Sequence, residues 1–315
     1  MRWASGNAKD MKKNTLLVIV GPTAVGKTAL AVRLGQTLGG EVVSADSRQI
    51  YRGMDIGTAK PTAKERAQTP HHLIDIRDPD DPLSLAEYQS LAYETINNLL
   101  AGNKLPILAG GTGQYVRAIV EGWGIPAVSP NEALRAELYA EAERYGRQAL
   151  HARLSDMDPA AAERIDARNV RRVVRALEVC LLAGQPISEL QRKTPPPFHI
   201  LQIGLTRPRP ALYRRVDDRV DGMIAAGLVD EVRGLVKAGY GWNLPAMSGL
   251  GYRQMGGFLR GEGSLEDAVQ SIKRETRRFI RQQYNWFRLT DPLIHWFDLE
   301  ITVLPEIEAA IADLL

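Results

Sequence analysis

An apolar run followed at once by a glycine-bounded loop constrains this chain more than any other feature of its sequence. Residues 15–20 read TLLVIV, and residues 21–28 read GPTAVGKT. A short β-rich apolar run is typical of a strand that is buried on both faces, as in parallel sheets covered by helices. The loop has the spacing G-x-x-x-x-G-K-[S/T], which requires a strand before it and a helix after it. We therefore expect a phosphate-binding loop in an α/β fold.

The phosphate chemistry of this loop follows from its backbone. The N–H groups of residues 23–28 and the N-terminus of the following helix form a positive concavity for phosphate oxygens. We expect the Lys27 amine to reach a terminal phosphate and the Thr28 hydroxyl to hold magnesium. The motif indicates a di- or triphosphate, ATP among them, without distinguishing one from another. The residues assigned to this site are Gly21, Thr23, Ala24, Val25, Gly26, Lys27 and Thr28.

Strands and helices are predicted to alternate through the rest of the chain. A helix is expected at residues 84–101. Further strands are expected at residues 41–46, 71–76, 106–111, 199–205 and 295–299. Alternation of this kind is typical of a parallel sheet wrapped by helices.

A helical segment interrupts this alternation. Residues 131–190 are rich in Ala, Arg and Glu, and three prolines at residues 195–197 end the pattern. The predicted fold class is α/β, a P-loop-type parallel sheet core wrapped by helices, with an inserted all-helical subdomain. The core is expected to be discontinuous, at residues 15–119 and 199–315, and the insertion at residues 120–198. Residues 1–14 are read as a polar leader.

Composition excludes several classes of protein. The 315 residues suffice for about two domains. The apolar run at residues 16–20 is too short for a membrane span or a signal segment. We therefore expect a cytoplasmic protein that does not associate with a membrane. The single cysteine, Cys180, cannot form an internal disulfide or a cysteine-based zinc site alone. Forty basic against 37 acidic side chains leave a net charge of only +3, so the position of the arginines matters more than their total.

Asp46 is the first candidate for chemistry outside the loop. It ends the second predicted strand, at the sheet edge where α/β proteins bind ligands. We considered two functional roles, a magnesium ligand and a general base, and one structural role, the N-cap of the segment that follows. The polar, glycine-punctuated residues 46–62 are typical of a long functional loop.

Two arginine stripes indicate a polyanionic partner. On helices, the spacing of each set places its members on one face, with Val170, Val173 and Val174 on another face of the first helix. The sets are Arg168, Arg171, Arg172 and Arg175, and then Arg274, Arg278, Arg281, Asn285 and Arg288. The alternative is a solvated face balanced by acids, for which Glu178 and Glu275 are nearly the only nearby candidates. Nucleic acid is the favoured partner, and Tyr252, Tyr284 or Trp286 could stack a base.

Seven segments in order resemble the tRNA dimethylallyltransferase family in its bacterial form. The resemblance covers residues 17–288, and the run after the phosphate loop is its most specific part. The segments are GPTAVGKT, DSRQIYRGMDIGTAKP, PHHLIDI, GGTGQY, RALEV, GLGYRQ and RQQYNWFR. The zinc-finger tail of some eukaryotic members has no counterpart here.

The resemblance implies a reaction and its partners. A dimethylallyl group would pass from dimethylallyl diphosphate to the exocyclic amine of the adenine 3′-adjacent to the anticodon, in tRNAs that read codons beginning with U. The phosphate loop would hold the diphosphate, with magnesium as the cofactor. The partners would be the tRNA anticodon stem-loop and the diphosphate, and the enzyme would be a monomer.

The same resemblance implies roles for individual residues. Asp46 would take the proton from the amine, and Thr112 would lie beside the reacting centre. Lys27 and Arg219 would contact the diphosphate. The residues implied to contact tRNA are Asp46, Ser47, Arg48, Gln49, Arg171, Arg172, Arg175, Ser248, Gly251, Tyr252, Arg253, Arg281, Gln282, Gln283 and Arg288. Val173 and Val174 lie among them but are expected in the core.

Three other functions share part of this pattern. A small-molecule kinase would use the loop and Asp46 with ATP, but it leaves both arginine stripes unexplained. An adenylate isopentenyltransferase would use the same donor with a free nucleotide, and it has little use for a basic helical insertion. An RNA-binding protein with the loop as a switch would bind tRNA without needing Asp46 or Thr112 for chemistry.

Overall fold

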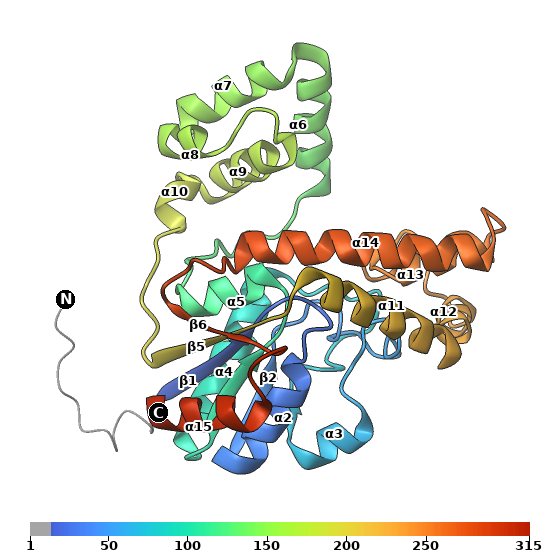
Figure 1. Cartoon of the computed structure of the whole chain (residues 1–315). Coiled ribbons are helices and arrows are strands. Elements are labelled where there is room, and N and C mark those ends of the chain that lie inside the picture. Colours follow the sequence, from blue (N-terminus) through green and yellow to red (C-terminus); the bar gives the residue numbers. More distant parts are fainter. Residues whose placement is uncertain (1–13) are drawn as a thin grey trace. The chain divides into compact units, whose positions relative to one another are not determined.

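The computed structural model describes residues 14–315, and the expected leader lies outside this range except for its last residue. The contacts within the chain define two compact units. One consists of the residues up to Val120 together with Pro197–Leu315, and the other of Glu121–Pro196. The first unit holds the sheet, and the second holds α6 to α10 (Figure 1).

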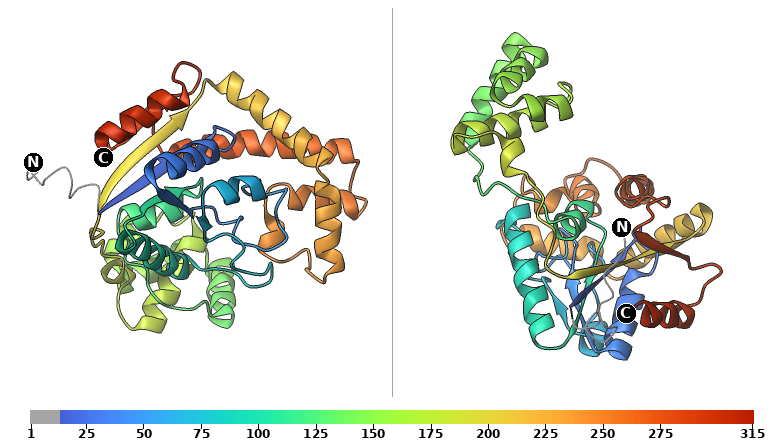
Figure 2. Two further views of the ribbon diagram at one scale, coloured as in Figure 1. Left: turned by 90° about the horizontal axis from the view of Figure 1, so that it is seen from below. Right: turned by 90° about the vertical axis from the view of Figure 1, so that its left-hand side faces the viewer.

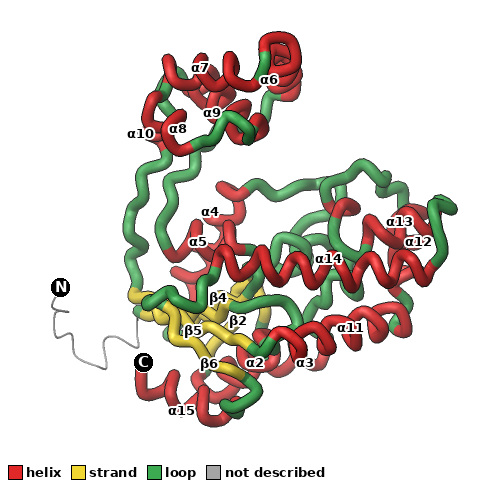
Figure 3. The backbone as a smooth tube through the Cα atoms, turned by 45° about the horizontal axis from the view of Figure 1, so that its top comes forward, coloured by secondary structure: helices red, strands yellow, loops and turns green. Residues whose placement is uncertain are grey.

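A single parallel sheet forms the centre of the first unit, which confirms the predicted fold class. Its six strands lie in the order β3-β2-β4-β1-β5-β6. The strands are β1 Thr15–Val20, β2 Gly40–Ser44, β3 His71–His72, β4 Leu105–Ala109, β5 His199–Thr206 and β6 Ile294–Asp298. The two parts of the unit meet at the pairing of β1 with β5, where Thr15 lies opposite His199. The strands lie together between the helices in Figure 3.

The third predicted strand is much shorter than expected. Residues 71–76 were predicted as a strand, but only His71 and His72 pair with β2. Leu73 and Asp75 take φ values of 60° and 56°, in the left-handed region that a strand cannot contain. The apolar pattern of this segment therefore reflects packing of an irregular loop against the sheet.

Alternate residues of β1 pack on opposite faces of the sheet. Leu16, Val18 and Val20 pack in the cluster formed with α4 (Leu85–Ala101) and α5 (Gly113–Val120). Leu17 and Ile19 pack in the cluster formed with α2 (Lys27–Leu38) and α15 (Leu304–Leu314). The right-hand view of Figure 2 shows α4 on one side of the strands and α2 and α15 on the other. Both faces are buried, as the continuous apolar sequence of β1 predicts.

Six further helical segments belong to the described part of this unit. They are α3 Ala63–Gln68, α11 Arg209–Ala225, α12 Leu228–Lys237, η1 Ala246–Ser248, α13 Tyr252–Leu259 and α14 Leu265–Trp286. The α11 and α14 helices lie side by side, joined by ion pairs of Asp217 with Arg277 and of Asp221 with Lys273. No helix in residues 14–315 is long and apolar enough to cross a membrane.

The second unit is helical and has its own core. It contains α6 Glu132–Tyr145, α7 Arg147–Met157, α8 Pro159–Arg164, α9 Val170–Ala183 and α10 Ile187–Leu190. Val173 and Val174 are buried in this core, as expected. Glu178 is fully buried, where it binds Arg135 and Arg175 and accepts a hydrogen bond from the backbone of Asn131. A buried carboxylate of this kind is stable only because its partners replace water.

Candidate active site

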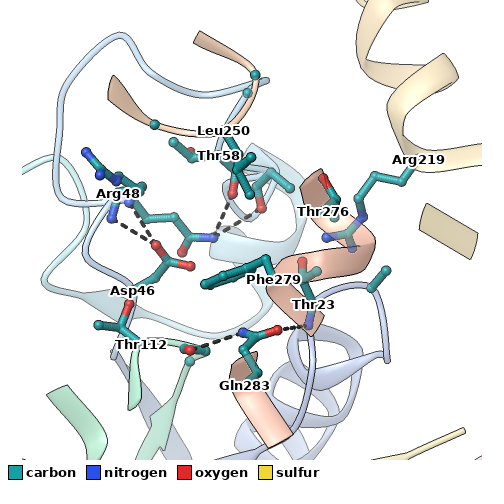
Figure 4. Close-up of a pocket in the computed structure, with 18 of the residues that line it drawn as sticks. Thr23, Asp46, Arg48, Thr58, Thr112, Arg219, Leu250, Thr276, Phe279 and Gln283 are labelled. Atoms are coloured by element: carbon teal, nitrogen blue, oxygen red, sulfur yellow. Dashed lines mark hydrogen bonds between the residues drawn. The ribbon is translucent and has the colours of Figure 1, made fainter. Parts of the chain in front are cut away.

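A cavity of about 630 Å³ lies at the carboxyl ends of β1, β2 and β4. Three loops that begin at these strand ends line it: the phosphate loop, the segment from Asp46, and the segment from Gly110 (Figure 4). Most of the predicted site residues therefore come together. Those that line the cavity are Thr23, Ala24, Gly26, Lys27, Thr28, Asp46, Ser47, Arg48, Gln49, Thr112, Arg219, Ser248, Gly251, Tyr252, Arg253, Gln282 and Gln283.

The phosphate loop has the tight path that its glycines allow. Gly21 and Gly26 have φ values of 140° and 124°, which side chains rarely adopt. A Cβ on Gly21 would also lie 2.4 Å from the Leu205 carbonyl oxygen. The Lys27 amine donates to the carbonyl oxygens of Gly21 and Pro22, both at 2.9 Å. These bonds hold the amine against the first two residues of the loop.

Positive charge is concentrated around this loop. Burial and then the charge of Arg219 lower the pKa of Lys27 to about 8, against a smaller opposing effect of Asp46. Arg215 lies one helical turn before Arg219 on α11, lines the same cavity, and donates from Nε to the Ala24 carbonyl oxygen at 2.9 Å. Arg215 was not predicted as a site residue. Its position four residues before Arg219 would have indicated that the two side chains lie on the same face of a helix. Like charges this close are favourable only when an anion joins them.

Asp46 faces the cavity from the end of β2. Its Oδ1 atom accepts hydrogen bonds from the backbone N–H groups of Arg48, at 2.9 Å, and Gln49, at 3.4 Å. The structural role considered for Asp46 is thus present, because this oxygen caps the turn that follows. The Oγ1 atom of Thr112 accepts a hydrogen bond from the Ser47 backbone at 3.0 Å. Asp46 and Thr112 are therefore held next to each other from neighbouring strands.

Arg48 and Gln49, which we expected to contact tRNA, are bound within the protein. Arg48 donates from Nη1 to the Pro245 carbonyl oxygen at 2.6 Å. The Gln49 amide donates to the carbonyl oxygens of Thr58 and Ala59, each at 3.2 Å. These bonds fix the walls of the cavity, and a contact of the Gln49 Nε2 group with RNA would have to replace them.

Tyr252 and Glu231 hold another wall of the cavity. Glu231 accepts hydrogen bonds from three successive backbone N–H groups, at residues 55–57. The Tyr252 hydroxyl donates to the same carboxylate at 2.6 Å. Tyr252 is only 1% exposed, so a base could stack on its ring only if this packing changed. Glu231 was not predicted from the sequence, because its backbone partners lie about 175 residues away.

Gln283 also departs from expectation. We expected it to contact tRNA, but its side chain is 2% exposed and bonded at both ends within the protein. The Thr23 backbone N–H donates to Gln283 Oε1 at 2.8 Å, and Gln283 Nε2 donates to the Gly111 carbonyl oxygen at 3.0 Å. Figure 4 shows the amide between these two loops.

The two arginine stripes are only partly balanced by acids. On and just before α9, Arg168 pairs with Asp166 and Arg175 pairs with Glu178. Arg171 and Arg172 are exposed, and no carboxylate in the described part of the chain pairs with them. Along α14 and just beyond it, the exposed members are Arg274, Arg278, Arg281, Asn285 and Arg288. Ile280 and Phe287 of the same segment are buried.

Comparison with known proteins agrees with this geometry. Residues 49–290 match the family model described as IPP transferase. This chain belongs to the IPP transferase family. Among its relatives, the tRNA dimethylallyltransferase of Roseiflexus sp. (strain RS-1) is 55% identical over 87% of this chain and 90% of its own length. That of Chloroflexus aurantiacus (strain J-10-fl) is 56% identical over 89% of this chain and 95% of its own length.

A solved structure extends the comparison to the fold. The full-length tRNA isopentenylpyrophosphate transferase from Bacillus halodurans is 42% identical and superposes with a TM-score of 0.71. The match covers 95% of this chain and 96% of that one. The IPP transferase family therefore accounts for both units of this chain, the helical one included.

The residues that line the cavity are compatible with magnesium only if a ligand supplies most of its oxygens. Residues 14–315 contain no cluster of three or more His, Cys, Asp or Glu side chains suited to a metal. The Thr28 hydroxyl and the Asp46 carboxylate both line the cavity. Magnesium is commonly held by one or two protein oxygens together with substrate phosphates. The donor set thus fits a magnesium ion that arrives with a diphosphate.

Proposed function

We propose that this protein transfers a dimethylallyl group from dimethylallyl diphosphate to an adenine of tRNA. The acceptor is the exocyclic amine of the adenine 3′-adjacent to the anticodon, in tRNAs that read codons beginning with U. One observation carries the proposal: a single cavity is lined by a phosphate loop on one side and by Asp46 and Thr112 on the other. The names of the relatives support the same reaction.

The donor side must stabilise charge on the leaving group. As the bond between the allylic carbon and the diphosphate oxygen breaks, its electron pair leaves with the diphosphate. Lys27, Arg219 and the backbone N–H groups of the loop are placed to bind that charge. When bound through Thr28 and the diphosphate oxygens, magnesium supplies further neutralisation of the leaving group.

The acceptor side must activate a weak nucleophile. The adenine amine is a poor nucleophile because its lone pair is delocalised into the ring. That nitrogen forms the new bond to the allylic carbon, and its proton passes to Asp46. The target adenine must leave its stack in the anticodon loop to reach the cavity. Thr112, whose hydroxyl accepts a hydrogen bond from the Ser47 backbone, is assigned a place beside the reacting atoms.

The exposed arginines are assigned to the RNA. Arg171 and Arg172 in the helical unit, and Arg278 and Arg281 on α14, present uncompensated charge that phosphates would neutralise. An RNA of the size of an anticodon stem-loop would contact more of these residues than a free nucleotide. We therefore favour tRNA over AMP as the acceptor. We also propose a monomeric enzyme that acts in the cytoplasm, where tRNA is modified.

Product analysis tests the proposal. A synthetic anticodon stem-loop is incubated with dimethylallyl diphosphate, magnesium and the full chain, then digested and examined by mass spectrometry. The expected result is one added C5H8 unit on the adenine that follows the anticodon. An unmodified RNA, or an addition spread over other bases, would refute the proposed specificity.

A further inference from the structure

Gln283 is a buried side chain that joins two of the loops that line the cavity. Its Oε1 atom accepts from Thr23 in the phosphate loop, and its Nε2 atom donates to Gly111 in the loop after β4. A backbone N–H can only donate and a carbonyl oxygen can only accept, so the amide has one orientation. Each bond uses one lone pair of the amide oxygen or one hydrogen of the amide nitrogen, and together they tie the side chain to the backbone of both loops.

The packing around this amide leaves little freedom. A Cβ on Gly111 would lie 2.4 Å from Gln283 Nε2, so the helix approaches this loop as closely as glycine allows. One turn further along α14, Trp286 packs against Gly113, where a Cβ would lie 2.2 Å from the indole. The α14 helix is therefore seated directly on the loop that carries Thr112.

These contacts connect the two halves of the proposed reaction. Thr23 belongs to the loop assigned to the diphosphate. Gly111 is followed by Thr112, whose hydroxyl accepts from Ser47 beside Asp46. A rigid link therefore runs from the leaving-group side, through one glutamine, to the side that holds the base.

We propose that Gln283 is a positioning residue that sets the separation between the phosphate loop and the Thr112–Asp46 edge. The inference rests on the proposed function, because it concerns the geometry of that transfer. Bond formation requires the amine and the allylic carbon at near-attack distance, and small displacements of either reactant are costly. Gln283 acts on that distance through its two backbone partners.

Two substitutions distinguish this role from simple space filling. In Gln283→Met the volume is nearly kept while both hydrogen bonds are lost. In Gln283→Glu a protonated carboxyl can still accept from Thr23 and donate to Gly111, whereas the ionised form can only accept. The matched control is Gln270→Met, the same change at an exposed position of the same helix, outside the cavity.

The experiment compares kcat and KM of these variants in transfer to a stem-loop RNA across pH. For Gln283→Met we expect kcat to fall roughly 10- to 100-fold, with far smaller changes in KM for either substrate. For Gln283→Glu the rate relative to wild type should fall as pH rises. Lys27 is the charged group that faces the new carboxyl, 3.8 Å from the site of a Cβ on Gly111, and its titration contributes to the pH profile of both enzymes. Gln270→Met should match wild type.

Each contrary result has a definite meaning. An unchanged kcat in Gln283→Met, or a loss confined to KM for the RNA, would overturn the positioning role. If that variant does not fold, a pH-independent ratio for Gln283→Glu would overturn it instead. Absence of transfer by the wild-type protein would overturn the proposed function, and this assignment with it. Transfer by the wild-type protein with an unchanged kcat in Gln283→Met would overturn this assignment alone.

Discussion

The Ser47 backbone N–H donates to the Thr112 hydroxyl at 3.0 Å and thereby joins the carboxyl ends of β2 and β4. Because Ser47 directly follows Asp46, this bond fixes the carboxylate relative to the rest of the cavity. The arrangement places a carboxylate and a hydroxyl on one side of the site, opposite a cluster of cations. Asymmetry of this kind suits a reaction in which one partner loses a proton while the other loses an anion.

Asp46→Asn should remove the base while keeping the turn. The asparagine Oδ1 atom can still accept from Arg48 and Gln49, so we expect an unchanged fold. Single-turnover transfer should slow by about 100- to 10,000-fold, the usual contribution of a positioned base. Affinity for RNA should hardly change, and rapid-quench kinetics with filter binding measure both. A loss smaller than about tenfold would rule out this role for Asp46.

Lys27 should give the enzyme an alkaline limit. Its pKa in the free protein is lowered from 10.5 to about 8, so the protonated form is lost as pH rises through that value. We expect kcat/KM for the diphosphate to fall above about pH 8, while kcat holds to higher pH because bound diphosphate favours the charged amine. Lys27→Gln should lack this inflection. A wild-type kcat/KM that stays level well above this pH would contradict the assignment.

Arg215 should contribute to diphosphate binding although its Nε atom is bound to the loop. Arg215→Gln should weaken binding of inorganic pyrophosphate by about 10- to 100-fold, the cost of a charge-assisted contact. Arg214→Gln is the control, because it removes the same charge from the neighbouring exposed position without touching the cavity. Titration calorimetry measures both. Equal losses in the two variants would indicate a general charge effect and no contact by Arg215.

Arg172 should contact an RNA phosphate. Arg172→Ala should weaken stem-loop binding and reduce the slope of log affinity against log salt by about one. Arg153→Ala serves as the control in the same unit, because Arg153 is engaged with Glu141. Binding isotherms at several salt concentrations provide the slopes. If the slope of Arg172→Ala equals that of wild type, Arg172 belongs to an ordinary solvated face.

The sheet and the phosphate loop could be predicted from the sequence because their signals are local. A continuous apolar run indicates a strand, and the loop motif fixes what precedes and follows it. The segment at residues 71–76 misled this reasoning because its apolar residues pack as a loop. Two left-handed residues, Leu73 and Asp75, cannot be recognised from hydrophobicity.

The cavity itself was only partly predictable. Gln283 was assigned to RNA along with its neighbours, yet it lies three residues after Ile280 and four before Phe287, on the buried face of α14. That periodicity was available in the sequence and should have outweighed the surrounding arginines. The bonds of Arg48 with Pro245 and of Glu231 with the backbone of residues 55–57 could not be predicted, because these partners lie more than 170 residues away along the chain.

One assay tests the central claim most directly: transfer of label from radiolabelled dimethylallyl diphosphate by the full chain. Three reactions are run, with an adenine-containing anticodon stem-loop, with AMP, and without an acceptor, while ATP hydrolysis is followed in parallel. The account predicts label in the stem-loop alone. Label in AMP would leave the chemistry and discard the RNA acceptor, and brisk ATP turnover with no label anywhere would contradict the prenyl transfer itself.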